Sequence, residues 1–228
     1  MCTETTRRSV DFNGDGKWRL KDTLIEALSF RDRQETRTTL EINGNPSDTD
    51  RYKLKGTFSG GEFGGVLQAV FRSESKADFQ WKETDALKAE AGRVERGQGE
   101  QGQAGTVQVF DYRVDAANSS FSVTGSNGQR IVVGFHGQVF IESTTRRVRR
   151  VTLIADNLPA DFPTRSTSMG VDYDYVAING LKYMMPVSAE LRLSQGPREV
   201  LMNTMEFGDY KRFATDLKPA GFTPADHP

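Results

Sequence analysis

Alternation of apolar and polar side chains with a period of two most constrains what this chain can fold into. Successive residues of a strand point to opposite faces, so this alternation is typical of a half-buried β-strand. The segment 107–114 carries Phe110, Tyr112 and Val114 on one face. The same pattern places five apolar side chains on one side of segment 130–142, namely Ile131, Val133, Phe135, Val139 and Ile141. Similar runs follow within 151–155, 171–175, 187–193 and 201–207. The sequence therefore predicts a mainly β protein.

Turn signals separate these runs. The Asn-Gly pairs at 43–44, 127–128 and 179–180 favour the positive φ angles that tight hairpins need, and so does the run 13–16. We therefore predict a hairpin of strands 3–12 and 17–30, and a meander of long antiparallel strands in the second half of the chain.

Helical periodicity is confined to short segments. Residues 61–71 place Phe63, Val66, Leu67, Val70 and Phe71 at helical spacing. The segment 85–91 could add a further turn or two. We expect one domain over residues 1–218, with a flexible Gly/Gln-rich loop at 97–105 and a disordered tail at 219–228.

Charge and cysteine content exclude several partners. The 30 basic and 31 acidic residues give a net charge of -1, so the molecule as a whole is not drawn to nucleic acid or anionic lipid. Cys2 is the only cysteine, which rules out an internal disulfide. No apolar run approaches the roughly 18 residues of a membrane-spanning helix, so we expect peripheral membrane association at most. The abrupt start at residues 1–3 suggests that a natural leader has been removed.

The segment 11–22 matches part of a calcium-binding loop. It places Asp11, Asn13 and Asp15 at loop positions one, three and five, Gly16 at position six and Asp22 at position twelve. The aspartate at position twelve is shorter than the usual glutamate, and residues 1–10 make a poor helix. A plain hairpin turn is the favoured interpretation, and a calcium site remains an alternative.

Catalytic and metal-binding motifs are missing from the sequence. His136 and His227 are the only histidines, too few for a zinc site with the lone Cys2. There is no nucleophile elbow or phosphate-binding loop, so we expect no enzyme and no cofactor. Asp172 and Asp174 share one strand face and are interpreted as solvated. The basic run 146–150 is interpreted as an exposed hairpin or edge strand.

Several runs of the sequence together resemble a family of uncharacterised, secreted bacterial envelope proteins. The runs are CTETTRR (2–8), LSFRDRQE (28–35), INGNP (42–46), GEFG (61–64), ESKADFQW (74–81), GQVFIE (137–142), DNLPADFP (156–163), LKYMMP (181–186) and NTMEFGDY (203–210). The order of elements is also similar, more distantly, to the Lol-type lipoprotein carriers and their lipoprotein-sorting relatives.

This resemblance implies a half-barrel: a single curved antiparallel sheet with one or two short helices, of which 61–72 would be the lid. It also implies a periplasmic or secreted protein. Aromatic and methionine side chains on the concave face would then bind an apolar ligand, an acyl chain or a lipoprotein segment. The residues that we expect to bind it are Phe110, Tyr112, Phe135, Tyr173, Tyr175, Met185 and Met205.

Two alternatives remain open at this point. One is an envelope interaction or scaffold module whose sheet is fully packed and has no ligand cavity. The other is a calcium-dependent module that uses Asp11, Asn13, Asp15 and Asp22. Oligomeric state does not follow from the sequence.

Overall fold

The computed structural model describes residues 1–228 except 32–33, 55–57, 59, 87–104, 197 and 213–228. The strands of the first half are β1 (Cys2–Asp11), β2 (Arg19–Arg31), β3 (Gln34–Ile42), β4 (Asn45–Pro46), β5 (Asp78–Ala86) and β6 (Thr106–Val114). Those of the second half are β7 (Ser122–Thr124), β8 (Arg130–Val132), β9 (Phe135–Glu142), β10 (Val148–Ala155), β11 (Ser166–Ile178), β12 (Leu181–Ser194) and β13 (Val200–Gly208). The described α-helix is α1 (Gly65–Phe71), and short 3-10 turns lie at Arg51–Lys53, Ser73–Ser75 and Ala116–Asn118.

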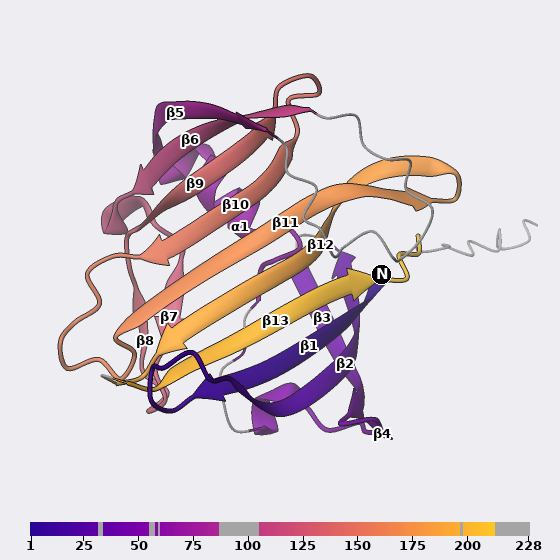
Figure 1. Ribbon diagram of the computed structural model, residues 1–228, viewed down its shortest axis with the longest axis vertical. Helices are drawn as coiled ribbons and strands as arrows, with labels where there is room; N and C mark the ends of the chain where they lie inside the picture. The colour runs from indigo at the N-terminus through magenta and orange to yellow at the C-terminus, as the bar shows by residue number, and fades with distance from the viewer. Residues whose placement is uncertain (32–33, 55–57, 59, 87–104, 197, 213–228) are drawn as a thin grey trace, which may run out of the picture.

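Most of the described strands form one antiparallel sheet, in the order β4-β3-β2-β1-β13-β12-β11-β10-β9-β6-β5. Figure 1 shows the sheet curling back on itself, so that β3 passes behind β13. The first and last strands pair with each other, with Thr3 opposite Gly208, and β4 and β5 are the two edges of the sheet formed by the described strands. The predicted fold class, one curved antiparallel sheet with little helix, is confirmed.

The apolar core lies on the concave face of this sheet, beneath α1. The helix buries Val66, Ala69 and Val70. Val66 and Val70 are among the apolar positions that its periodicity predicts, whereas Phe71 of the same set is 46% exposed. Central strands supply the facing side chains, among them Tyr112, Val114, Phe135, Val139, Val151, Leu153, Val171, Tyr173, Leu191 and Met205. The predicted lid helix therefore covers the concave face.

Two of the predicted Asn-Gly turns are two-residue hairpins with positive φ at both residues. Asn43 and Gly44 have φ of 53° and 77°, and Asn179 and Gly180 have φ of 51° and 78°. Mirror-image turns of this kind match the right-handed twist of the strands that they join. They set the registers of the β3–β4 and β11–β12 pairs.

A β-bulge in the β11–β12 pair reverses which side chains face inward. The register shifts between Asp172 and Tyr173, so that Asp172 lies opposite Ser188 and Tyr173 opposite Pro186. Val187 is the extra residue of the bulge. Beyond it Met184, opposite Tyr175, packs against the core, whereas Met185 lies opposite Asp174 on the outer face.

Two local predictions were wrong. Segment 130–142 is not one strand, because β8 pairs with β7 in a separate two-stranded sheet and the chain enters β9 at Phe135. Gly134 lies at this break, where a Cβ atom would lie 3.1 Å from the Val114 carbonyl oxygen. Asp85 and Ala86 continue strand β5 instead of starting a helical turn. Three predicted segments lie outside the described residues, wholly or in large part. They are the remainder of segment 85–91, most of the Gly/Gln-rich loop at 97–105, and the tail at 219–228.

No helix among the described residues is both long enough and apolar enough to cross a membrane.

Candidate functional site

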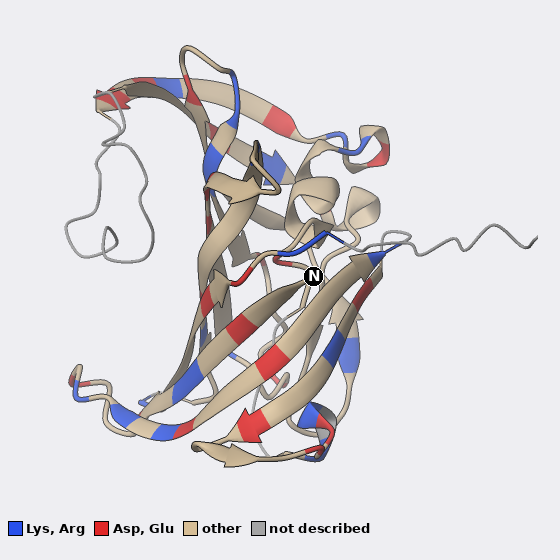
Figure 2. Ribbon diagram, turned by 90° about the vertical axis from the view of Figure 1, so that its right-hand side faces the viewer, with Lys and Arg blue, Asp and Glu red and all other residues tan. Residues whose placement is uncertain are grey.

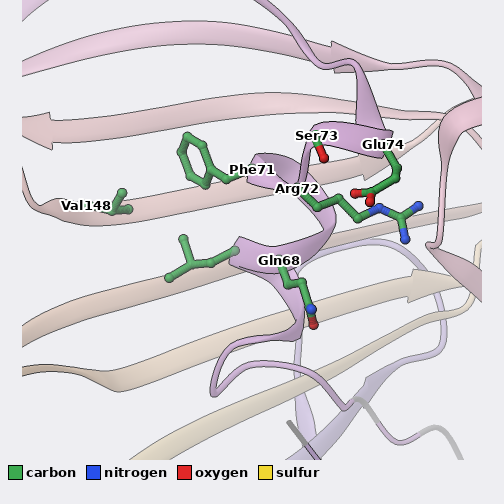
Figure 3. Close-up of a pocket in the computed structure, with 7 residues that line it drawn as sticks. Gln68, Phe71, Arg72, Ser73, Glu74 and Val148 are labelled. Atoms are coloured by element: carbon green, nitrogen blue, oxygen red, sulfur yellow. The ribbon is translucent and has the colours of Figure 1, made fainter.

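An open cleft separates α1 from the start of β10. Its volume is about 790 Å³, and it is lined by Leu67, Gln68, Phe71, Arg72, Ser73, Glu74 and Val148. Figure 3 shows Phe71 extending toward Val148, while Gln68, Arg72 and Glu74 lie on the other side of the helix. The cleft therefore has an apolar side toward the sheet and a polar rim.

A chain of aromatic contacts leads from the cleft into the core. The Phe71 ring, 46% exposed, stacks on Phe79 of β5 at a centroid distance of 5.6 Å. Phe79 contacts Tyr112 at 6.0 Å, and Tyr112 contacts Phe135 edge-to-face at 6.0 Å. Such ring pairs add stabilisation beyond their buried area. The apolar surface is thus continuous from solvent to the centre of the sheet.

The polar rim is partly ordered by contacts of its own. The Arg72 guanidinium donates through Nη2 to the Asn118 carbonyl at 3.0 Å. Its Nε is buried and has no hydrogen-bond partner among the described residues. The backbone amide of Glu74 and the Ser73 hydroxyl lower the pKa of the Glu74 carboxyl, and Arg72 contributes to the same effect.

The N-terminal side of α1 is anchored by a buried charged cluster around Arg37. This guanidinium contacts Glu4 at 2.7 Å, Glu35 at 2.9 Å and Glu62 at 2.9 Å. Glu35 also accepts the backbone N–H groups of residues 61 and 63, at 3.0 and 3.1 Å. Burial opposes the charge of Arg37, but the three carboxylates outweigh it and raise its pKa. The cluster holds the segment before α1 against β3 and β1.

A second charged group lies on the same inner face of β1 and β2. Arg8 and Arg51 stack on the Phe58 ring, at 4.5 and 4.8 Å from its centroid. Arg8 pairs with Asp22, and Arg51 lies 3.2 Å from Glu26. Burial raises the pKa of Glu26, while Arg51 acts in the opposite direction. Together the two groups place buried charges on the inner face of β1–β3, beside apolar side chains such as Leu24 and Leu28.

Four of the seven predicted ligand residues lie in the core beneath α1. Tyr112, Phe135, Tyr173 and Met205 are between 0% and 4% exposed. They form the floor under the helix and do not line the cleft. Tyr112 also donates its hydroxyl to the Thr152 carbonyl at 2.7 Å, which fixes its ring.

The other three predicted residues are more accessible. Phe110 is half-buried and lies opposite Val139 on the inner face. Tyr175 is 40% exposed, beneath the Arg149 guanidinium at 5.6 Å. The β-bulge places Met185 on the outer face, so the expectation that it lies on the concave face was wrong. None of the seven lines the cleft.

Sequence reasoning missed most of the cleft and all of the charged clusters. Leu67 and Phe71 were identified as apolar positions of the lid helix, but Val148 was interpreted only as part of a basic run. Glu4, Thr6 and Arg8 alternate in β1 with a period of two, a pattern usually assigned to a solvated face. Here they are buried, at 0%, 1% and 4% exposure.

The segment 12–18 forms the turn of the β1–β2 hairpin. The Asp11 carboxylate accepts the backbone N–H groups of Asn13, Gly14, Asp15 and Gly16, at 2.8 to 3.4 Å. Asp22, the expected twelfth position of a calcium loop, pairs with Arg8 instead. No three Asp, Glu, His or Cys side chains within the described part of the chain are grouped to hold a metal ion.

The remaining polar candidates of the sequence form pairs on the outer face. Asp172 accepts from Arg150 at 2.8 Å and from Ser188 at 3.0 Å, and Asp174 pairs with Arg149 at 2.9 Å. His136 contacts Asp156 through Nδ1 at 2.6 Å. Arg113 contacts the same carboxylate at 3.3 Å, beside a smaller hollow of about 300 Å³.

Comparison of this chain with protein-family models, with curated proteins and with solved structures finds no match.

Proposed function

We propose that this protein is a non-enzymatic binding protein that holds an apolar ligand, an acyl chain or a lipoprotein segment, on the concave face of its sheet. The cleft between α1 and β10 is the observation that carries the proposal. Its volume of about 790 Å³ lies within the range of roughly 300–1,000 Å³ that is usual for small-molecule sites.

The walls of the cleft suit a hydrocarbon chain better than a polar substrate. Leu67, Phe71 and Val148 offer apolar surface, and the stacked Phe79 ring extends it. Burial of one methylene contributes about 0.8 kcal/mol, so ten methylenes contribute roughly 8 kcal/mol before ordering costs. Binding in the micromolar range or weaker is the expected result.

The packing beneath the helix limits how deep a ligand can reach. Tyr112, Phe135 and Tyr173 are already buried in the same core cluster as the inner side chains of α1. A chain of several carbons can lie in the cleft, but entry into the core requires α1 to move away from the sheet. The helix has seven residues, and the charged cluster around Arg37 anchors its N-terminal side. The resemblance to secreted envelope proteins supports a periplasmic site of action.

Displacement of a fluorescent fatty acid from the purified protein tests the proposal. The matched variants are Leu67→Trp, which fills the open cleft, and Phe71→Ser, which removes its exposed ring. Phe12→Ser is the control, because Phe12 is 55% exposed in the β1–β2 turn, away from the cleft. Both cleft variants should weaken binding about tenfold or more, and the control should leave it unchanged.

Absence of binding by the folded wild-type protein would eliminate this proposal and would favour the scaffold alternative. Equal binding by the wild-type protein and Leu67→Trp would place the ligand elsewhere on the molecule. Mass spectrometry of organic extracts from the purified protein would identify a lipid that copurifies with it.

A further inference from the structure

The β11–β12 hairpin extends beyond both of its neighbours in the sheet. Pairing of β11 with β10 ends at Asp172 opposite Arg150, and pairing of β12 with β13 ends at Ser188 opposite Glu206. Residues 174–185, here called the ribbon, are therefore paired only with each other among the described strands. Figure 1 shows the hairpin projecting past β13.

One face of the ribbon is almost entirely apolar. The pairs Val176–Tyr183 and Ile178–Leu181 share the outer face with Asp174 and Met185. Leu181 is 60% exposed and Tyr183 is 38% exposed. Exposed apolar side chains are common singly, but a contiguous stripe on a projecting element marks an interaction surface.

Unpaired basic side chains lie at the same end of the sheet. The turn between β9 and β10 contains Arg146 and Arg147, which are exposed and form no ion pair with any described residue. The next arginine, Arg149, contacts Asp174 at 2.9 Å and connects the start of β10 to the base of the ribbon. Figure 2 shows blue segments at the turn at the top of the molecule.

We propose that the ribbon and the basic turn together dock on an anionic lipid surface. The stripe would enter the interface between headgroups and acyl chains, while Arg146 and Arg147 contact lipid phosphates. A symmetric contact with a second copy of this chain fits less well, because it would bring two positive turns together. With a net charge of -1, the whole molecule is not attracted to an anionic membrane. Docking therefore depends on the arginines and apolar side chains at this end of the sheet.

The geometry relates this surface to the cleft. Val148, which lines the cleft, is the first residue of β10 and directly follows the basic turn. A molecule docked by this end therefore holds the cleft close to the lipid. The docking surface itself does not depend on the proposed ligand of the cleft.

Cosedimentation of the ligand-free protein with vesicles tests the proposal. Vesicles of phosphatidylcholine alone are compared with vesicles that also contain phosphatidylglycerol, at low and high salt. The protein should bind the anionic vesicles, and salt should weaken the binding. Each arginine near an anionic surface contributes about a fivefold increase in affinity, so Arg146→Ser with Arg147→Ser should weaken binding roughly 25-fold. Leu181→Asp with Tyr183→Asp should weaken it at least about tenfold.

Matched controls lie at the opposite end of the sheet. Leu20 is also 60% exposed, so Leu20→Asp makes the same change at a distant site, and Lys17→Ser with Arg19→Ser removes two charges from the β1–β2 end. These controls should bind vesicles like the wild-type protein, and circular dichroism should show all variants folded. Vesicle binding should also persist in Leu67→Trp, which separates this proposal from that of the cleft.

Three results would overturn the proposal. They are no binding to anionic vesicles, equal loss of binding in the control and ribbon variants, and a solution dimer that Leu181→Asp dissociates.

Discussion

The Arg37 guanidinium lies 2.9 Å from the Glu62 carboxylate and joins strand β3 to the segment that precedes α1. Both side chains are buried, with 8% and 0% exposure. Glu4 and Glu35 contact the same guanidinium, so three carboxylates share one cation. Removal of the cation would leave these buried carboxylates without the positive charge that they share.

Arg37→Met should therefore lower the free energy of unfolding by roughly 3–5 kcal/mol, as measured by urea denaturation. The control is Arg7→Met, because Arg7 pairs with Glu206 at a similar distance of 3.0 Å but at the surface, where the side chains are 43% and 46% exposed. Arg7→Met should lower the free energy of unfolding by less than about 1 kcal/mol. Equal losses in the two variants would contradict the proposed anchoring of the lid segment.

Gly137→Ala should destabilise the pairing of β9 with β10. A Cβ atom at this position would lie 1.9 Å from the Thr152 carbonyl oxygen, which already accepts the Tyr112 hydroxyl. The strands must separate locally, at a cost of about 1–3 kcal/mol or more in thermal or urea unfolding. Gly208→Ala is the control, since a Cβ atom there meets nothing within 4 Å. Unchanged stability of Gly137→Ala would show that the two strands lie farther apart.

Asp11→Ala should lower the melting temperature at neutral pH. Desolvation raises the pKa of Asp11, but the backbone N–H groups of the turn outweigh this effect and hold the pKa below its ordinary value of 3.8. A lowered pKa in the folded state means that the carboxylate stabilises the fold above pH 3.8, and that this contribution is lost as the pH falls through the lowered pKa.

The difference in melting temperature between wild type and Asp11→Ala should thus be constant near neutral pH and shrink below pH 3.8. Asp15→Ala serves as the control, because among the described residues the Asp15 carboxylate contacts the 85% exposed Lys17 side chain and the Lys17 amide. A difference that persists unchanged in acid would mean that the lost contacts are not those of an ionised carboxylate.

Met184→Ala should destabilise the protein more than Met185→Ala. The bulge turns Met184 to the inner face, where it packs against the core, and leaves Met185 on the outer face. In urea denaturation, we expect the free energy of unfolding to fall by roughly 1–2 kcal/mol for Met184→Ala and by less than about 0.5 kcal/mol for Met185→Ala. The reverse order would show that the bulge is absent in solution.

The predictions that succeeded depend on neighbours in the sequence. Alternation in 107–114 and the Asn179-Gly180 turn identify strands and hairpins because side-chain direction and positive φ are local properties. Local alternation also explains the errors. A single bulged residue at Val187 exchanges the faces of Met184 and Met185. The sequence marks this position only through Pro186, since a proline within a central strand is typical of a bulge.

The sequence by itself determined that this chain forms antiparallel strands joined by tight turns, with a short helix near residue 65. Only the tertiary structure decided what each strand face meets. Glu4 and Arg37 are buried because the sheet curls and the segment before α1 covers them, and the cleft exists because α1 stands away from Val148. Curvature and long-range pairing join residues far apart in the chain, so a pattern with a period of two can distinguish the two faces but cannot show what covers either.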